Sequence, residues 1–386
     1  MTVAPMSFQT ELDFLKQNHL HRSLRRIESP QGREVTAGGR RLLNFSSNDY
    51  LGLASDPRLA EAAAEAARRW GTGSGASRLL SGPLGIHHEL EEKIAAFRRE
   101  EAAIVFSSGF AANLGAIPAL VGEGDAVWID RFSHASIVDA ARLSGARLRV
   151  YPHLDAEFLS RWLKRTRARR QLIVTDSYFS MDGDIAPLGE LADLAGRHGA
   201  TLMVDEAHAT GVFGPTGRGL LEEAGLEGRA GVVMGTFSKA FGSSGGFVAG
   251  RKDLIEFLAN RARTFIYTTG SSPASSAASV RAIEICQSDA APRERLWRNV
   301  RLLRQRLEAA GFDLMRSRGP IIPVLVKDTA RALGISEALL ETGILLPAIR
   351  PPTVPQGTDR LRISVTAAHT EEDLARLVQS LRHAFN

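Results

Sequence analysis

Compact apolar runs alternate with helix-like segments through the middle of the chain. The runs are rich in Val, Ile, Leu and Ala, and they lie at 103–109, 126–130, 148–153, 171–177, 201–208, 231–239 and 245–250. Amphipathic segments such as 135–145 and 187–199 separate most of them. Continuous β-branched runs that alternate with helices are typical of a mostly parallel sheet covered on both faces. The pattern therefore predicts an α/β fold.

The two ends of the chain have a different character. The first forty residues are polar and helix-prone, and they offer only a thin apolar stripe until 40–45, which predicts a short strand. After residue 285 a long amphipathic helix begins, marked by apolar residues at helical spacing: Leu296, Val300, Leu303 and Leu307. Further strands are predicted at 321–327, 344–349 and 360–365, and a closing helix at 371–385. We therefore expect a helical arm over 1–44, a large domain over 45–285 and a smaller α/β domain over 286–386.

Composition narrows the class of protein. Of 386 residues, 44% are hydrophobic and 24% are charged, which suits a chain with a sizeable core and argues against disorder. The single cysteine, Cys286, excludes an internal disulfide framework and a cysteine-based zinc cluster, and we expect no metal. We find no membrane-spanning run and no secretory signal pattern, so we expect a cytoplasmic protein that binds no membrane.

Several motifs support other functions only weakly. Gly71, Gly73 and Ala76 match a dinucleotide fingerprint, but a helical stretch precedes them where that motif needs a strand. His88 and Glu89 begin a zinc-protease motif that lacks its second histidine. The net charge of +5 and the six basic residues within 161–170 leave nucleic-acid binding as an alternative. Because no aromatic residues interleave into a basic stripe, a solvated helix face is favoured and we expect no nucleic-acid partner.

The polar residues that could carry chemistry follow the predicted strands. They fall at 107–109, 176–180, 205–208 and 236–239. In open α/β sheets, ligands bind at the carboxyl ends of the strands. We therefore expect these segments to meet in one site.

The residues in these segments are the parts of a pyridoxal phosphate (PLP) site. Lys239, just past a buried strand, can form a Schiff base, and Asp205 suits a protonated pyridine nitrogen. His208 follows three residues later, and the imidazole of His134 can stack on a flat ring. The segment 108–111 opens a helix, where free N–H groups favour a phosphate.

Motifs along almost the whole chain make a family resemblance visible. They are NFSSNDYLGLA, GSGASRLLSG, FSSGFAAN, SHASIVDA, SMDGDIAPL, VDEAHATGVFG, TFSKAFGSSGG and AIRPPTVPQGTDRLRISVTAAHT. The chain resembles the α-oxoamine synthase family of fold-type I PLP enzymes. That resemblance implies a mostly parallel sheet of the seven-stranded type in a large domain, with a smaller C-terminal α/β domain.

The same resemblance assigns roles around the cofactor. Lys239 is implied to hold PLP as a Schiff base, His134 to stack on its ring, Asp205 to pair with the ring nitrogen and His208 to bond the 3′-oxygen. Other residues are implied to line the cofactor: Ser108, Gly109, Phe110, Ser180 and Thr236. The family is homodimeric, and residues matching Tyr267, Thr268 and Thr269 approach the phosphate from the neighbouring chain.

The segment AIRPPTVP favours the branch of the family that condenses L-alanine with pimeloyl-CoA, or pimeloyl-carrier protein, in biotin biosynthesis. The alternative is a glycine-using branch of the family, such as glycine C-acetyltransferase (2-amino-3-ketobutyrate CoA ligase). A catalytically silent member of the family is a further alternative. Arg350 is the candidate for the amino-acid carboxylate, because a guanidinium can hold it with two bonds.

Other residues are assigned to the substrates with alternatives left open. Asn48 and Thr353 are candidate neighbours in the substrate cleft. Arg22 is implied to meet the far carboxylate of pimelate, with Arg25 and Arg26 as alternatives. Asp176 stands where some members carry Glu, which leaves its role open.

Overall fold

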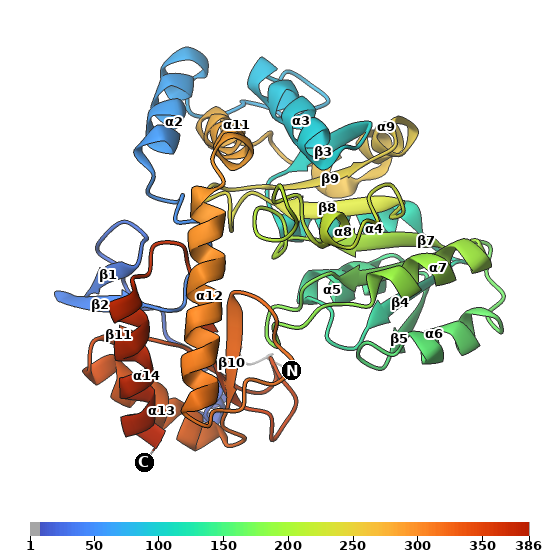
Figure 1. The fold of residues 1–386 in the computed structure, drawn as a ribbon. Helices are drawn as coiled ribbons and strands as arrows, with labels where there is room; N and C mark the ends of the chain where they lie inside the picture. Colours follow the sequence, from blue (N-terminus) through green and yellow to red (C-terminus); the bar gives the residue numbers. More distant parts are fainter. Residues whose placement is uncertain (1–7, 386) are drawn as a thin grey trace, which may run out of the picture.

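The computed structural model describes residues 8–385 and is built on a seven-stranded sheet (Figure 1). Its strands are β3 (Ala102–Phe106), β4 (Ala126–Asp130), β5 (Arg147–Tyr151), β6 (Gln171–Asp176), β7 (Thr201–Asp205), β8 (Val232–Thr236) and β9 (Gly246–Gly250). They lie in the order β3-β9-β8-β7-β6-β4-β5. β9 runs antiparallel to both neighbours, and the other neighbouring strands run parallel. The predicted mostly parallel sheet is confirmed.

Two hydrophobic cores cover the two faces of this sheet. Successive side chains of a strand point to opposite faces, so Leu172 and Val174 of β6 join one core and Ile173 joins the other. The first face is covered by α4 (Gly109–Leu120), α5 (Ala135–Leu143), α9 (Lys252–Arg261) and α10 (Arg263–Ile266). Helices that bury side chains in the other core include α3 (Gly85–Arg98), α6 (Ala156–Leu163), α7 (Leu188–His198) and α8 (Leu220–Glu223). Burial on both faces explains why the strands read as continuous apolar runs.

The helix α11 (Pro273–Ser288) packs beside α2 (Pro57–Trp70) and α3, and leads into the long helix α12 (Ala291–Ala309) (Figure 1). Beyond α12 lie two three-stranded sheets. One contains β10 (Ile321–Leu325), β13 (Arg360–Ser364) and β12 (Ala348–Ile349), and the other β1 (Glu34–Ala37), β2 (Arg40–Asn44) and β11 (Ile344–Leu345). The helices α13 (Thr329–Glu341) and α14 (Glu371–Phe385) complete this part.

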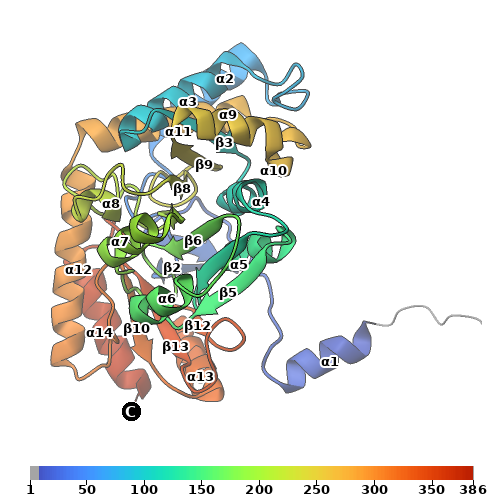
Figure 2. The ribbon, with the colours of Figure 1, turned by 90° about the vertical axis from the view of Figure 1, so that its right-hand side faces the viewer.

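The N-terminal segment differs from the helical arm expected over 1–44. Within residues 8–44 a helix is present only as α1 (Gln9–Gln17), which extends away from the body of the molecule (Figure 2). Residues 34–44 form a hairpin, and β2 of that hairpin pairs with β11 near the other end of the chain. The strand β2 agrees with the short strand expected at 40–45, whereas its pairing with so distant a strand leaves no local sequence signal. Residues 1–7 lie outside the described residues, and the division into domains stays a prediction.

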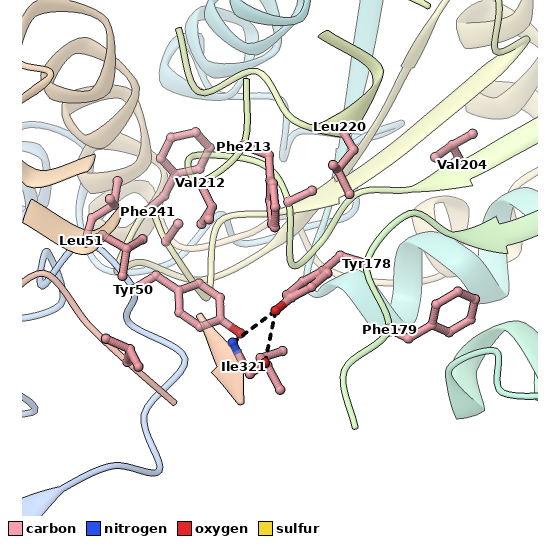
Figure 3. Packing of buried hydrophobic residues seen from close by; sticks show 14 of the residues in the cluster. Tyr50, Leu51, Tyr178, Phe179, Val204, Val212, Phe213, Leu220, Phe241 and Ile321 are labelled. Carbon is pink, nitrogen blue, oxygen red and sulfur yellow. Dashed lines mark hydrogen bonds between the residues drawn. The ribbon is translucent and has the colours of Figure 1, made fainter. Parts of the chain in front are cut away.

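One tyrosine joins the large sheet to the C-terminal sheet. Tyr178, two residues past β6, donates a hydrogen bond from its hydroxyl to the carbonyl of Ile321 (3.3 Å) and accepts one from the N–H of Ile321 (3.0 Å) (Figure 3). The loop that follows β6 is therefore anchored at the start of β10. Within residues 8–385, no helix is long and apolar enough to cross a membrane.

Candidate active site

The carboxyl edge of the sheet gathers the residues that the sequence singled out. Asp176, Asp205 and Thr236 end three adjacent strands, and Asp176 and Asp205 are direct partners in the parallel ladder. Ser108 caps the start of α4 and His134 caps the start of α5. The expectation that these segments meet in one place is confirmed by the fold.

Lys239 lies three residues past β8, and its side chain has an unusual electrostatic setting. Burial disfavours the ammonium form and lowers the pKa of Lys239 to about 8, against the opposing charges of Asp205 and Asp176. Among the described residues, its Nζ has no hydrogen-bond or ion-pair partner. A lysine with these properties offers a neutral, nucleophilic amine near physiological pH.

The carboxylate of Asp205 is fixed by hydrogen bonds on both oxygens. Oδ2 accepts from Nδ2 of Asn113 on α4 at 2.9 Å, and Oδ1 accepts from the N–H of Ala207 at 2.9 Å. Nδ2 of Asn113 also donates to Oγ of Ser136 on α5 at 2.9 Å. Asp205 is thus a buried, oriented anion at the strand end, which suits a protonated pyridine nitrogen.

Hydrogen bonds fix both the backbone and the imidazole of His134. Its N–H donates to Oδ2 of Asp176 at 3.0 Å, and Nδ1 lies 2.8 Å from Oγ of Ser136. The ring of Phe110 meets it edge-on, with centroids 6.3 Å apart. Desolvation lowers the pKa of His134, and the nearby charge of Lys239 adds to this effect. Burial and the neighbouring Asp205 raise the pKa of Asp176 well above its usual range.

His208 is buried and neutral. Burial lowers its pKa well below the usual value, and the charges of Lys239 and Arg362 act in the same direction. Its Nδ1 lies 2.7 Å from the hydroxyl of Tyr50, within hydrogen-bond distance. Tyr50 was not singled out from the sequence, although it lies within the motif NFSSNDYLGLA.

The start of α4 forms an anion cradle beside β8. Ser108 accepts from the N–H of Ala111 at 3.0 Å, while the first N–H groups of a helix have no partner within it. A Cβ on Gly109 would lie 3.0 Å from Cε of Met234 and 3.4 Å from Cβ of Thr236, so glycine allows this close approach. Oγ1 of Thr236 also lies 2.9 Å from Oγ of Ser238.

These residues fit PLP. They provide a lysine without a partner among the described residues, a buried oriented carboxylate, a flat ring and a cradle of N–H and hydroxyl groups for a phosphate. The fit rests on the chemistry of the side chains present and on their common place at the sheet edge.

A cleft of about 650 Å³ opens beside His134 and Ser180. Arg22 and Thr353 line it together, and Nη2 of Arg22 donates to Oγ1 of Thr353 at 3.2 Å. Its wall also includes Arg131, Phe132, Phe179 and Met181. Arg22 also lines a neighbouring hollow together with Arg25, but Arg25 and Arg26 do not line the cleft itself. Arg131 is a second cation in the cleft that the sequence did not single out.

Two further arginines lie near the site: Arg350, which the sequence singled out, and Arg362, which it did not. Arg350 donates to the backbone carbonyls of His19 and His21, the latter at 2.8 Å, so its guanidinium holds the segment that leads to Arg22. Its role toward a substrate carboxylate stays a prediction. Arg362 on β13 is buried, donates to Oδ1 of Asn48 at 3.1 Å, and its charge lowers the pKa of Lys239. The signal for it was present, because it lies in the same motif as Arg350.

The segment expected to serve a neighbouring chain lies near the start of α4. Thr269 forms an isolated antiparallel bridge with Ser77, and Thr268 lines a hollow beside Tyr267 and Ala111. Their role toward a cofactor of a second subunit stays a prediction.

Comparison with known proteins defines the class. Residues 40–381 match the family model of aminotransferase class I and II. The chain belongs to this family and is a PLP-dependent enzyme of fold type I. It is similar to solved serine palmitoyltransferases: that of Sphingomonas wittichii has a TM-score of 0.93 and 34% identity, over 98% of this chain and 96% of that one. A structure from S. paucimobilis, with 35% identity, contains bound PLP.

The curated relatives point to one member of the class. A protein from Geobacter metallireducens named 8-amino-7-oxononanoate synthase is 52% identical over 96% of both chains. One of the same name from Symbiobacterium thermophilum is 50% identical, over 94% of this chain and 93% of the relative. A solved 8-amino-7-oxononanoate synthase from Francisella tularensis has a TM-score of 0.78 and 28% identity, over 89% of this chain and 98% of that one.

Proposed function

We propose that this enzyme condenses L-alanine with pimeloyl-CoA or pimeloyl-carrier protein. The products are 8-amino-7-oxononanoate, carbon dioxide and the free thiol, and the reaction belongs to biotin biosynthesis. The observation that carries this proposal is Lys239 beside Asp205 at the sheet edge, in a chain about half identical to relatives that bear this enzyme's name over nearly their full length.

The chain's own residues supply the proton transfers. Bound PLP provides an electron sink for negative charge at Cα of the amino acid. Asp205 would hold the protonated ring nitrogen of the cofactor, and the neutral amine of Lys239 would remove the proton from Cα of alanine. His134 would hold the cofactor ring by stacking, and it would donate a hydrogen bond to the thioester oxygen as negative charge develops there.

The cations of the site suit the two carboxylates of the substrates. Arg362 donates a hydrogen bond to Asn48, and its charge acts on Lys239. Arg350 binds the backbone of the N-terminal segment at His21. We assign the carboxylate of alanine to this pair of arginines. The cleft of Arg22 and Thr353 has apolar walls and cationic groups, which suits a hydrocarbon chain that ends in a carboxylate. Arg22 is therefore assigned to the far end of the pimeloyl group.

We also propose that the enzyme acts as a homodimer in the cytoplasm. The bridge between Ser77 and Thr269 brings together two segments that expose large apolar side chains: Leu79 (53% exposed), Leu80 (75%) and Tyr267 (72%). Exposed large apolar side chains gathered on neighbouring segments are typical of protein interfaces. The cytoplasmic assignment rests on the single cysteine of the sequence.

A substrate matrix tests the proposed reaction. L-Alanine, glycine and L-serine are each combined with pimeloyl-CoA, acetyl-CoA and palmitoyl-CoA, and thiol release is followed with PLP present. We expect the alanine and pimeloyl-CoA pair to exceed every other pair by at least about tenfold in kcat/KM. Preference for glycine with acetyl-CoA, or for serine with palmitoyl-CoA, would replace the proposal with another reaction of the same class.

A further inference from the structure

A charged histidine lies behind the cleft and outside the groups that serve the reaction. His153 follows β5, and its ring nitrogens face two carboxylates: Nδ1 is 2.8 Å from Oδ1 of Asp130, and Nε2 is 2.9 Å from Oδ2 of Asp184. Carboxylate oxygens accept hydrogen bonds, so both nitrogens carry protons and the ring is a cation. Burial alone would lower the pKa of His153, but hydrogen bonds and charge from Asp130 and Asp184 outweigh it and raise the pKa to about 9.

The two carboxylates belong to the two loops that carry the site. Asp130 ends β4 and begins the turn to His134, and its Oδ1 also accepts from the N–H of Phe132 at 2.8 Å. Asp184 lies in the loop after β6, and its carbonyl accepts from the N–H of Phe179 at 3.0 Å. Its Oδ1 is buried without a partner among the described residues, so its other oxygen relies on His153.

The imidazole also contacts the apolar wall of the cleft. The ring of Phe132 lies 4.5 Å from it between centroids, and the ring of Phe179 lies at the same distance from another side, nearly perpendicular. Both phenylalanines line the cleft beside His134 and Ser180. His153 therefore touches the two aromatic walls while lying outside the cleft itself.

Two arginines of β13 also hold this loop. Arg360 on β13 pairs with Asp182 at 2.6 Å, and Arg362 donates to the carbonyl of Ser180. The segment 179–184 is thus fixed between His153 and the arginines of the C-terminal sheet. Without the charge of His153, Asp130 and Asp184 would be buried carboxylates that lack this counter-charge.

We propose that His153 is a positioning residue that links the loops after β4 and β6 and thereby holds Phe132 and Phe179 as the wall that binds the acyl chain. This inference rests on the proposed function, because it assigns that cleft to the acyl donor. His153 acts on acyl-donor affinity and leaves the binding of L-alanine and PLP almost unchanged. Its partners are Asp130, Asp184 and the two phenylalanines, and none of these is assigned to alanine or to PLP.

The variant His153→Gln in the full-length holoenzyme tests the proposal. Glutamine removes the charge and the ring while keeping a polar group of similar reach. We expect KM for pimeloyl-CoA to rise about tenfold, with KM for L-alanine and the affinity for PLP changed by less than about twofold. The matched control is His383→Gln on the exposed end of α14, which should leave all three constants unchanged.

The pH dependence separates positioning from a general loss of stability. His153 is charged below a pKa of about 9, and the groups that face it are Asp130 and Asp184. In the wild type, KM for pimeloyl-CoA should rise as pH passes through about 9, whereas in His153→Gln it should already be high and stay flat over this range. Titration of Lys239 alters kcat in both proteins and does not produce this difference.

The following results decide whether His153 positions the wall of the cleft. An unchanged KM for pimeloyl-CoA in His153→Gln overturns the proposal, and so does an equal rise of KM for both substrates. If that variant does not fold, Asp184→Asn, which weakens one of the two ion pairs, must show the same selective rise in smaller measure. If the wild type prefers another acyl thioester, the proposed function fails and the same comparison is made with that thioester.

Discussion

The backbone N–H of His134 donates a hydrogen bond to Oδ2 of Asp176, over 3.0 Å. This contact joins the start of α5 to the end of β6 and fixes where the imidazole of His134 enters the site. Asp176 is buried beside Asp205, which raises its pKa and disfavours its charged form. The residue whose role the sequence left open therefore acts on the backbone of the stacking histidine.

Two substitutions of Asp176 separate its hydrogen bond from its charge. Asp176→Asn keeps an oxygen acceptor for the N–H of His134, so we expect kcat within about fivefold of the wild type. Asp176→Ala leaves that N–H without its partner, at a cost of about 1–3 kcal/mol, and kcat should fall about tenfold or more. Steady-state kinetics with L-alanine and pimeloyl-CoA provide the measurement. Equal losses in the two variants would show that the charge matters and the bond does not.

Covalent attachment of PLP to Lys239 can be mapped directly. Borohydride reduction of the holoenzyme followed by proteolysis and mass spectrometry should find the pyridoxyl group on the peptide that contains Lys239. The variant Lys239→Ala should carry no covalent cofactor and show no turnover. The matched control is Lys252→Ala at the start of α9, which should retain both. A pyridoxyl group on another lysine of the wild type would refute the assignment.

The lowered pKa of Lys239 gives the uptake of PLP a defined pH dependence. The neutral amine is the nucleophile, and it accumulates as pH rises toward a pKa of about 8. In protein freed of cofactor, the rate of PLP uptake should therefore grow about tenfold per pH unit below that value and level off above it. Stopped-flow absorbance from pH 6 to 10 measures this. A midpoint near the ordinary lysine value would mean that the site does not desolvate the amine.

Arg22 and Arg25 form a natural pair of test and control. Both arginines line the neighbouring hollow, but only Arg22 of the two also lines the cleft and contacts Thr353. In Arg22→Ala we expect kcat/KM for pimeloyl-CoA to fall about 10- to 100-fold, the size expected for loss of a charge-assisted contact. Turnover of heptanoyl-CoA, which lacks the terminal carboxylate, should change little, and Arg25→Ala should change neither.

The contrary results for this pair are equally specific. A similar loss for both thioesters in Arg22→Ala would mean that the arginine supports folding or binds the CoA part. A selective loss in Arg25→Ala would transfer the carboxylate to that residue.

Sequence reasoning was strongest where the signal is local. The alternation of apolar runs and helices predicted the large sheet, because burial on both faces forces continuous apolar strands. Lys239, Asp205 and His134 were found because polar residues follow those strands, and parallel strands end at one edge of the sheet.

What sequence reasoning missed depends on contacts between distant segments. Asn113 meets Asp205 across 92 positions, and Tyr50 meets His208 across 158. Arg350 donates to the carbonyls of His19 and His21. These contacts depend on the path of the N-terminal segment, which no sequence motif indicates. The short strand expected at 40–45 is present as β2, but the sequence did not predict β1 or the pairing of β2 with β11, which lies some three hundred residues away.

The most direct measurement follows the carboxyl carbon of alanine. Purified enzyme with PLP, pimeloyl-CoA and L-alanine labelled with ¹³C at the carboxyl position should release labelled carbon dioxide and CoA in equal amounts. Mass spectrometry should then find 8-amino-7-oxononanoate without label. A product that retains the label, or release of CoA without carbon dioxide, would contradict the decarboxylative condensation at Lys239.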